Sequence, residues 1–140
     1  MKIRTAWWVG LMMLALGAPA TLADEAKERA ALAVAEQWLA AVDQGQYART
    51  WKEAASVFRN AVTQASWEQS MEAVRKPLGK TVSRTVKSAS YTDTLPGAPP
   101  GEYVVINFDT AFEHKAAAVE TVTPMLDADG KWRVSGYFIQ

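Results

Sequence analysis

The sequence predicts an α+β domain in which three amphipathic helices pack on a four-stranded, curved antiparallel sheet. In the first half of the chain, apolar residues recur at intervals of three and four, as they do along one face of a helix. After Gly79 the composition changes to threonine, valine and aromatic residues, which favour strands. Helices and strands are segregated along the chain, and short turns join the strands, so the sheet is expected to be antiparallel.

Three helices account for the apolar periodicity. The first ends at Gly45, the second begins near Tyr47, and the third begins at Thr63 or Ser66, whose hydroxyl groups can cap free amide groups. Pro77 and Gly79 end the third helix. The predicted buried stripes are Leu32, Ala35, Leu39 and Val42; Tyr47, Trp51, Ala55, Phe58 and Val62; and Trp67, Met71, Val74 and Leu78.

Four strands are predicted at residues 81–94, 102–113, 117–126 and 131–139. A proline-rich turn at 95–101 separates the first two, and a tight hairpin at 127–130 joins the last two. If residues 113–116 also form a short loop, Phe108 lies opposite Thr121 and Thr123 lies opposite Val134.

This register gives the sheet two different faces. The face expected to receive the helices carries Val104, Ile106, Phe108, Phe112, Val119, Met125, Trp132, Val134 and Phe138. The outer face mixes aromatic and charged side chains: Tyr103, Val105, Asn107, Asp109, Glu120, Val122, Arg133 and Tyr137. One interpretation of the outer face is a homodimer interface centred on Val105, Val122 and Tyr137.

Residues 1–23 are typical of an export signal. Lys2 and Arg4 precede an apolar run from Trp7 to Leu16, and small residues lead to a cleavage point near Ala23. A helix needs about 20 apolar residues to cross a bilayer, and this run is shorter, so no membrane span is expected. Residues 24–140 then form a single domain in the periplasm or outside the cell.

Composition excludes several classes of chemistry. The chain has no cysteine, which excludes disulfides and thiolate metal sites, and its single histidine, His114, falls at a predicted hairpin tip. No metal site or cofactor is therefore expected. Basic and acidic residues balance at 15 each, which argues against nucleic acid as the main partner.

The candidate site residues fall into three groups. Asp109, Glu120 and Tyr137 come together in the predicted register, with Asp109 across from Glu120 and Glu120 across from Tyr137; such a row is either structural or, inside a cavity, an acid–base pair. Arg75 and Arg84 flank a turn, where they can pair with Asp43 or Glu102 or bind an anion. The tryptophans can form the core or line an apolar pocket: Trp38, Trp51, Trp67 and Trp132.

The chain also resembles a known family. The residues that carry the resemblance include Trp38-Leu39, Thr50-Trp51, Arg75-Lys76-Pro77-Leu78-Gly79 and, most specifically, Asp129-Gly130-Lys131-Trp132-Arg133-Val134-Ser135-Gly136-Tyr137-Phe138. They are similar to the small exported bacterial proteins grouped as domain of unknown function 4019. The resemblance implies an exported protein and brings no established activity. Three helices followed by a curved sheet also resemble the cystatin-like, nuclear-transport-factor-2-like cone, an analogy of fold alone.

The leading hypothesis is a non-catalytic module that binds a protein partner or a small apolar ligand. It follows from the lack of a nucleophile, metal set or cofactor motif, together with the tryptophan-rich junction of helices and sheet. The alternatives are a cavity enzyme using Asp109 or Glu120 as acid or base, and a structural accessory of the cell envelope.

Overall fold

The computed structural model describes residues 19–140 and confirms the predicted α+β class. The predicted export signal lies, through residue 18, outside the described residues. The helices are α1 (Pro19–Asp43), α2 (Tyr47–Lys52), α3 (Ser56–Ala61) and α4 (Gln64–Leu78). The strands are β1 (Thr81–Thr92), β2 (Tyr103–Phe112), β3 (Lys115–Leu126) and β4 (Trp132–Ile139). They form one antiparallel sheet in the order β1-β2-β3-β4.

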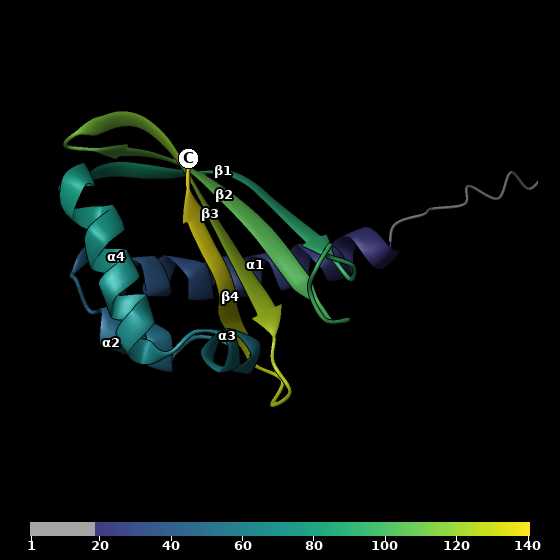
Figure 1. The fold of residues 1–140 in the computed structure, drawn as a ribbon. Helices are drawn as coiled ribbons and strands as arrows, with labels where there is room; N and C mark the ends of the chain where they lie inside the picture. The colour runs from purple at the N-terminus through teal and green to yellow at the C-terminus, as the bar shows by residue number, and fades with distance from the viewer. Residues whose placement is uncertain (1–18) are drawn as a thin grey trace, which may run out of the picture.

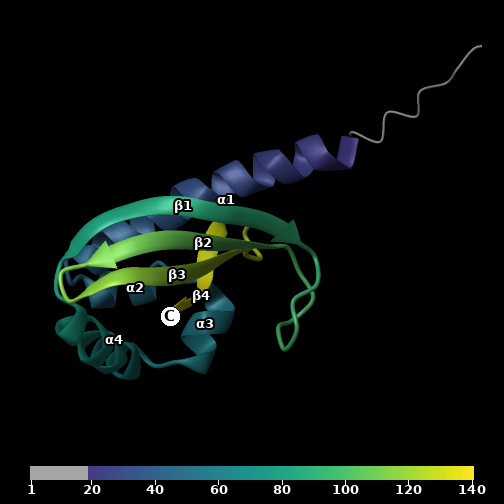
Figure 2. The same cartoon turned by 90° about the horizontal axis from the view of Figure 1, so that it is seen from above.

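The sheet is curved, and the helices stand against it. Helix α1 crosses and contacts all four strands, while the contacts of α4 are mainly with α2 (Figure 1). Figure 2 shows the curvature of β1, β2 and β3 from above. Among the helices of the described residues, none is long and apolar enough to span a membrane.

The core lies between α1 and the inner face of the sheet. Its α1 side is a buried stripe, in which Ala35, Leu39 and Val42 are at most 1% exposed. These residues confirm the predicted stripe, although Leu32 at its edge is only partly buried. The apolar residues that meet the stripe from the sheet are Val104, Ile106, Phe108, Val122 and Val134.

The predicted second helix is instead two short helices. The segment leaves the helical conformation at Ala55, whose ψ is 151°. Ala55 is fully buried, and its N–H donates to the carbonyl of Val134 at 2.8 Å. The Ala55 N–H thus forms a hydrogen bond to β4 and not one within a helix. The spacing of apolar residues does not predict this break.

Helix α4 begins as predicted and buries a different face. The Thr63 hydroxyl accepts from the Ser66 N–H at 3.2 Å, so Thr63 is the cap. Trp67 and Met71 are buried as expected, and Arg75 is buried with them. Val74, predicted to be buried, is 47% exposed, because α4 packs on α2 more than on the sheet.

The predicted strand register is wrong by one residue or more. Phe108 lies opposite Glu120 rather than Thr121, because β2 contains an irregularity between Thr110 and Phe112. Val134 lies opposite Pro124 rather than Thr123, in the register that already pairs Leu126 with Trp132. Beyond this pair the ladder shifts again, so that Thr123 lies opposite Gly136 and Ser135 forms a bulge. A bulge adds one residue to one strand of a pair, which changes the residues that face each other beyond it.

The shifts correct the assignment of residues to the two faces. Glu120 and Val122, predicted outside, are fully buried, and Tyr137 packs against the core. Phe138, predicted inside, is 52% exposed, and Val119 is only partly buried. The outer face therefore lacks two of the three residues on which the predicted dimer was centred.

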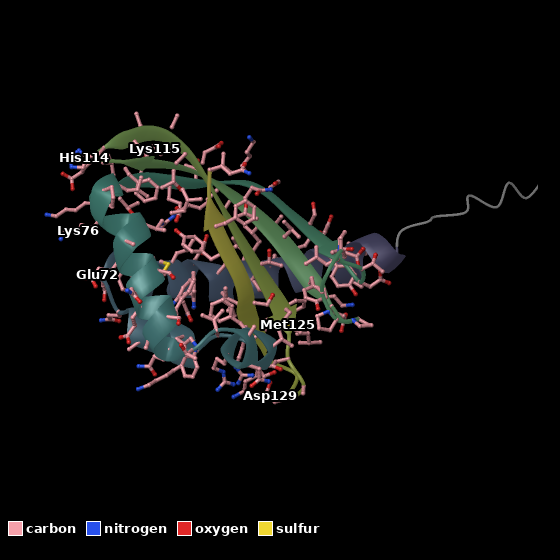
Figure 3. All side chains as sticks on the ribbon, viewed as in Figure 1. Glu72, Lys76, His114, Lys115, Met125 and Asp129 are labelled. Atoms are coloured by element: carbon pink, nitrogen blue, oxygen red, sulfur yellow. The ribbon has the colours of Figure 1, made fainter. Side chains whose placement is uncertain are left out.

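Tyr103 and Met125 form a second, smaller cluster. Tyr103 was predicted on the outer face, but it is 1% exposed because Leu95 and Ala98 of the proline-rich turn cover it. Met125 and Ala55 complete the cluster, which lies at the end of the sheet where Figure 3 labels Met125.

The hairpin between β2 and β3 is short. Figure 3 shows His114 and Lys115 at its outer tip, above the end of α4 that carries Lys76. His114 is exposed, as expected for a loop histidine, and its N–H donates to the Leu78 carbonyl at 3.0 Å. The hairpin is thereby tied to the end of α4.

Candidate functional site

A partly buried ionic cluster joins α1 to the inner face of the sheet. Arg84 of β1 forms two hydrogen bonds with the Asp43 carboxylate at 2.8 and 3.0 Å. Its Nε donates to Glu120 of β3 at 2.7 Å. Asp43 ends α1, so one guanidinium group holds the helix end and two strands of the sheet together. Bidentate pairs of this kind are among the stronger charge-assisted contacts.

Glu120 is the deepest member of the cluster. Its side chain is fully buried and accepts hydrogen bonds from Arg84, from the Thr110 hydroxyl at 2.6 Å, and from the Tyr137 hydroxyl. Burial of an unpaired carboxylate is costly, and this set of donors offsets that cost. Burial, reinforced by the nearby Glu120 charge, raises the pKa of Tyr137 far above its usual value, so Tyr137 remains a hydrogen-bond donor.

In Asp43 and Arg84, the members of the cluster nearer the surface, hydrogen bonding and opposite charge together have a larger effect on the pKa than burial has. Burial by itself would raise the pKa of Asp43, but hydrogen bonds from Arg84 and Thr81 and the charge of Arg84 lower it. Burial would likewise lower the pKa of Arg84, but its bonds to Asp43 and Glu120 raise it. Both pKa shifts favour the charged form, so Asp43 is a carboxylate and Arg84 a guanidinium ion at neutral pH.

Only some of the hydrogen-bond donors of Arg75 have a partner among the described residues. Its side chain is 6% exposed, and Nη2 donates to Asp43 at 3.2 Å and to the Thr81 hydroxyl at 3.0 Å. Within the described residues, its Nε and Nη1 have no hydrogen-bond partner. The guanidinium lies 4.9 Å from the centre of the Phe112 ring, where a cation–π contact compensates in part.

The structure brings two of the three acid–base candidates together. Glu120 and Tyr137 are hydrogen-bonded on the inner side of the sheet. Asp109 is exposed, pairs with Val119 and lies opposite Thr85, so its predicted position across from Glu120 is wrong. Of the alternatives considered for Arg75 and Arg84, the structure shows both paired with Asp43.

The four tryptophans occupy different places. The indoles of Trp38 and Trp67 both donate to Thr50, at 3.0 and 2.9 Å, and their rings are 5.9 Å apart. Trp51 donates to the Val62 carbonyl at 2.7 Å. Trp132 is half-buried against the core at the start of β4. Trp67 in addition borders a hollow beside β4.

That hollow, about 280 Å³ in volume, lies between α4 and β4. Its walls are Trp67, Ser70, Met71 and Val74 of α4 and residues 137–139 of β4. A second hollow of about 340 Å³ adjoins it at Tyr137 and Phe138 and extends along β4 to α3 and the proline-rich turn. Together they form what we call the β4 groove.

The β4 groove is apolar and reaches the ionic cluster through Tyr137. Among the described residues, none of the side chains that border it is Asp, Glu, Lys, Arg or His. The Tyr137 ring lies 5.3 Å from Trp38, and its hydroxyl bonds to Glu120. The ring of Tyr137 therefore separates the groove from the buried charges. Phe138 and Val74, both about half exposed, form the rim.

Two other hollows are chemically less distinct. One, about 490 Å³, lies on the outer side of the sheet around Asp109 and is bordered mainly by alanine, serine and threonine. The other, about 520 Å³, borders Arg75 and mixes Glu72 and Glu113 with Lys76 and Lys80. The first therefore offers no large apolar side chains to a ligand, and the second carries charges of both signs.

The groove could not be predicted from the sequence, because the bulge at Ser135 determines on which side of β4 the Tyr137 side chain lies. The one feature of the sequence that indicates an apolar surface there is the run from Val134 to Gln140, which has no charged residue. The fold and the groove together define a small α+β domain with an apolar surface hollow.

Residues 34–137 match the family model described as a protein of unknown function (DUF4019), and the chain belongs to that family. A search of curated proteins finds no match.

Proposed function

We propose that this protein is an exported, non-catalytic module that binds an apolar ligand or protein segment in the β4 groove. The observation that carries the proposal is a groove that, within residues 19–140, is bordered by no charged side chain and whose rim exposes Val74 by 47% and Phe138 by 52%. Exposed apolar side chains gathered around a hollow mark interaction sites more often than isolated ones do. Export is supported by the composition of residues 1–23.

Binding of N-phenyl-1-naphthylamine, an uncharged aromatic dye, tests the proposal. The wild-type protein is expected to enhance the dye's fluorescence saturably. Val74→Glu places a charge on the rim and is expected to weaken binding about tenfold or more, because a charge next to a bound apolar group must be desolvated. Val82→Glu is the matched control, since Val82 is 68% exposed on β1 and borders neither hollow of the groove.

Two results contradict the proposal: no saturable binding to the wild-type protein, or equal loss of binding in the two variants. Circular dichroism of both variants shows whether either substitution unfolds the domain. Since both positions are exposed, each substitution is expected to change the free energy of unfolding by less than about 0.5 kcal/mol.

The cavity-enzyme alternative has one observation in its favour, the bond between Tyr137 and the buried Glu120 beneath the groove. An acid–base role needs a substrate to reach the Glu120 carboxylate, which the Tyr137 ring and Arg84 enclose. Carbodiimide labelling at neutral pH, read by mass spectrometry, discriminates the two functions. Modification of Glu120 in the folded protein favours the enzyme, and protection favours the binding module. An envelope accessory, the third alternative, predicts capture of a defined partner from periplasmic extract.

A further inference from the structure

We propose that the occupant of the β4 groove is an extended, uncharged segment of a partner protein that pairs with the free edge of β4 as an additional strand. This inference rests on the proposed function and adds to it the class of partner and the way in which the partner is held.

The first argument is the direction of the β4 main-chain groups. Val119 and Gln140 exchange two hydrogen bonds, both of 2.9 Å. In an antiparallel ladder the bonded positions alternate, so the groups of Phe138, opposite Thr121, also face β3. The N–H and C=O groups of Tyr137 and Ile139 therefore face away from β3. Within residues 19–140, no hydrogen bond of the turns and loops uses them.

The remainder of this edge is already occupied. The Val134 carbonyl, which also faces away from β3, accepts the Ala55 N–H at 2.8 Å. The segment before α3 thus covers the edge at Val134 and then turns into the helix at Ser56. The open stretch begins beyond this point and coincides with the groove.

The two edges of the sheet differ in how they are protected. Edge strands normally carry charges, bulges or covering segments that prevent pairing with another chain. The β1 edge has Arg84 and Lys87, shifts register twice, and its Tyr91 N–H is bonded to the Glu28 side chain at 3.0 Å. The β4 edge from Val134 to Gln140 has no charged side chain. An unprotected edge beside an apolar groove fits strand addition.

The groove also specifies the side chains of the segment. Successive side chains of an added strand point to opposite sides, so every second one faces the groove. Val74 and Phe138 offer apolar contacts to those side chains, and the uncharged walls offer no partner for a charged one. The matching segment therefore has apolar residues at alternate positions and lacks charge.

A second copy of the folded chain fits this edge less well. Figure 2 shows the end of β4 set back between α4 and α3, which both extend beyond it. A single extended segment can enter between the helices, whereas the β4 edge of another copy brings its own α3 and α4 against them.

A display library of random nine-residue peptides provides the probe. Selection on the wild-type protein is expected to enrich uncharged peptides with apolar residues at alternate positions. The strongest is then synthesised, and N-methylated at the alternate amides that would face β4. N-methylation removes main-chain donors and leaves side chains unchanged, so the dissociation constant is expected to rise about tenfold or more.

A protein variant tests the same bonds from the other side. Ile139→Pro removes an outward N–H, and proline is tolerated at such positions of edge strands. It is expected to weaken peptide binding about tenfold relative to Ile139→Val, which keeps both the N–H and an apolar side chain at this position. If Ile139→Pro unfolds, the N-methylated peptide still tests the inference on wild-type protein.

Each contrary result has a distinct meaning. Equal binding of the N-methylated peptide, or dye binding with no enriched peptide, overturns strand addition and leaves the proposed function intact. Failure of both dye and peptide overturns both. A wild-type dimer in sedimentation that Ile139→Pro converts to monomer identifies a second copy as the occupant and overturns the partner segment.

Discussion

Asp127 joins the β3–β4 hairpin to the start of α3, which forms one wall of the β4 groove. Its carboxylate accepts the Ser56 hydroxyl at 2.7 Å, the Ser56 N–H at 3.0 Å and the Ala128 N–H at 2.8 Å. The side chain is 8% exposed, and Arg133 lies 3.4 Å away. Asp127→Asn keeps the size of the side chain and removes its charge.

The expected effect follows from the pKa of Asp127. Hydrogen bonds from Ser56 and Ala128 lower this pKa from 3.8 to about 2. A difference of this size corresponds to about 2 kcal/mol of stability. Because the folded-state pKa is the lower one, the contribution is fully present above pH 3.8 and is lost as the pH falls through about 2. The variant lacks this pH-dependent contribution.

Urea unfolding followed by circular dichroism at a series of pH values measures the effect. Between pH 5 and pH 2 the free energy of unfolding of the wild type is expected to fall by about 2 kcal/mol more than that of Asp127→Asn. Asp129→Asn is the control: Asp129 is 46% exposed and pairs with Arg133, so its pH profile should follow the wild type closely. Parallel profiles for the wild type and Asp127→Asn would refute the reasoning.

Two further predictions concern the backbone. Gly79→Ala is expected to lower the free energy of unfolding by about 1–3 kcal/mol, because φ is +74° and ψ is −159° there and a Cβ atom would come within 3.0 Å of Glu113 and His114. Gly45→Ala, at φ +72° in open space, should cost less in the same thermal or urea unfolding experiment; equal costs would contradict the role given to the contact. In hydrogen exchange followed by NMR, the amide of Phe138 should exchange more slowly than those of Tyr137 and Ile139, and uniform protection along β4 would show that its edge is not open.

Local signals predicted the elements of the fold well. The cap at Thr63, the end of α4 at Gly79 and the hairpin at residues 127–130 depend on hydroxyl groups and on glycine conformations that neighbouring residues specify. The apolar stripe of α1 was also predicted, since a long amphipathic helix repeats its signal over several turns. The break at Ala55 was missed because its cause is a hydrogen bond to Val134, far along the chain.

The candidate site was predicted only in part. Glu120 and Tyr137 were predicted to lie opposite each other in a row that also held Asp109. The two do contact each other, but diagonally, because Tyr137 lies opposite Val122. Asp109 was placed with them because a register error of one residue moves a side chain to the other face. The burial of Arg75 could not be predicted from the sequence. Helix α4 packs mainly on α2 and not on the sheet, so the face that it buries differs from the predicted one.

The class of the fold, the order of its elements and most of their ends could be predicted from residues close together in the chain, because propensity, periodicity and turn chemistry act over a few residues. The buried faces of β3 and β4 could not, and the ionic cluster and the β4 groove depend on those faces. Side chains alternate between the two faces of a strand, so a single extra residue in a bulge reverses the faces, and the formation of a bulge depends on the packing of the whole domain.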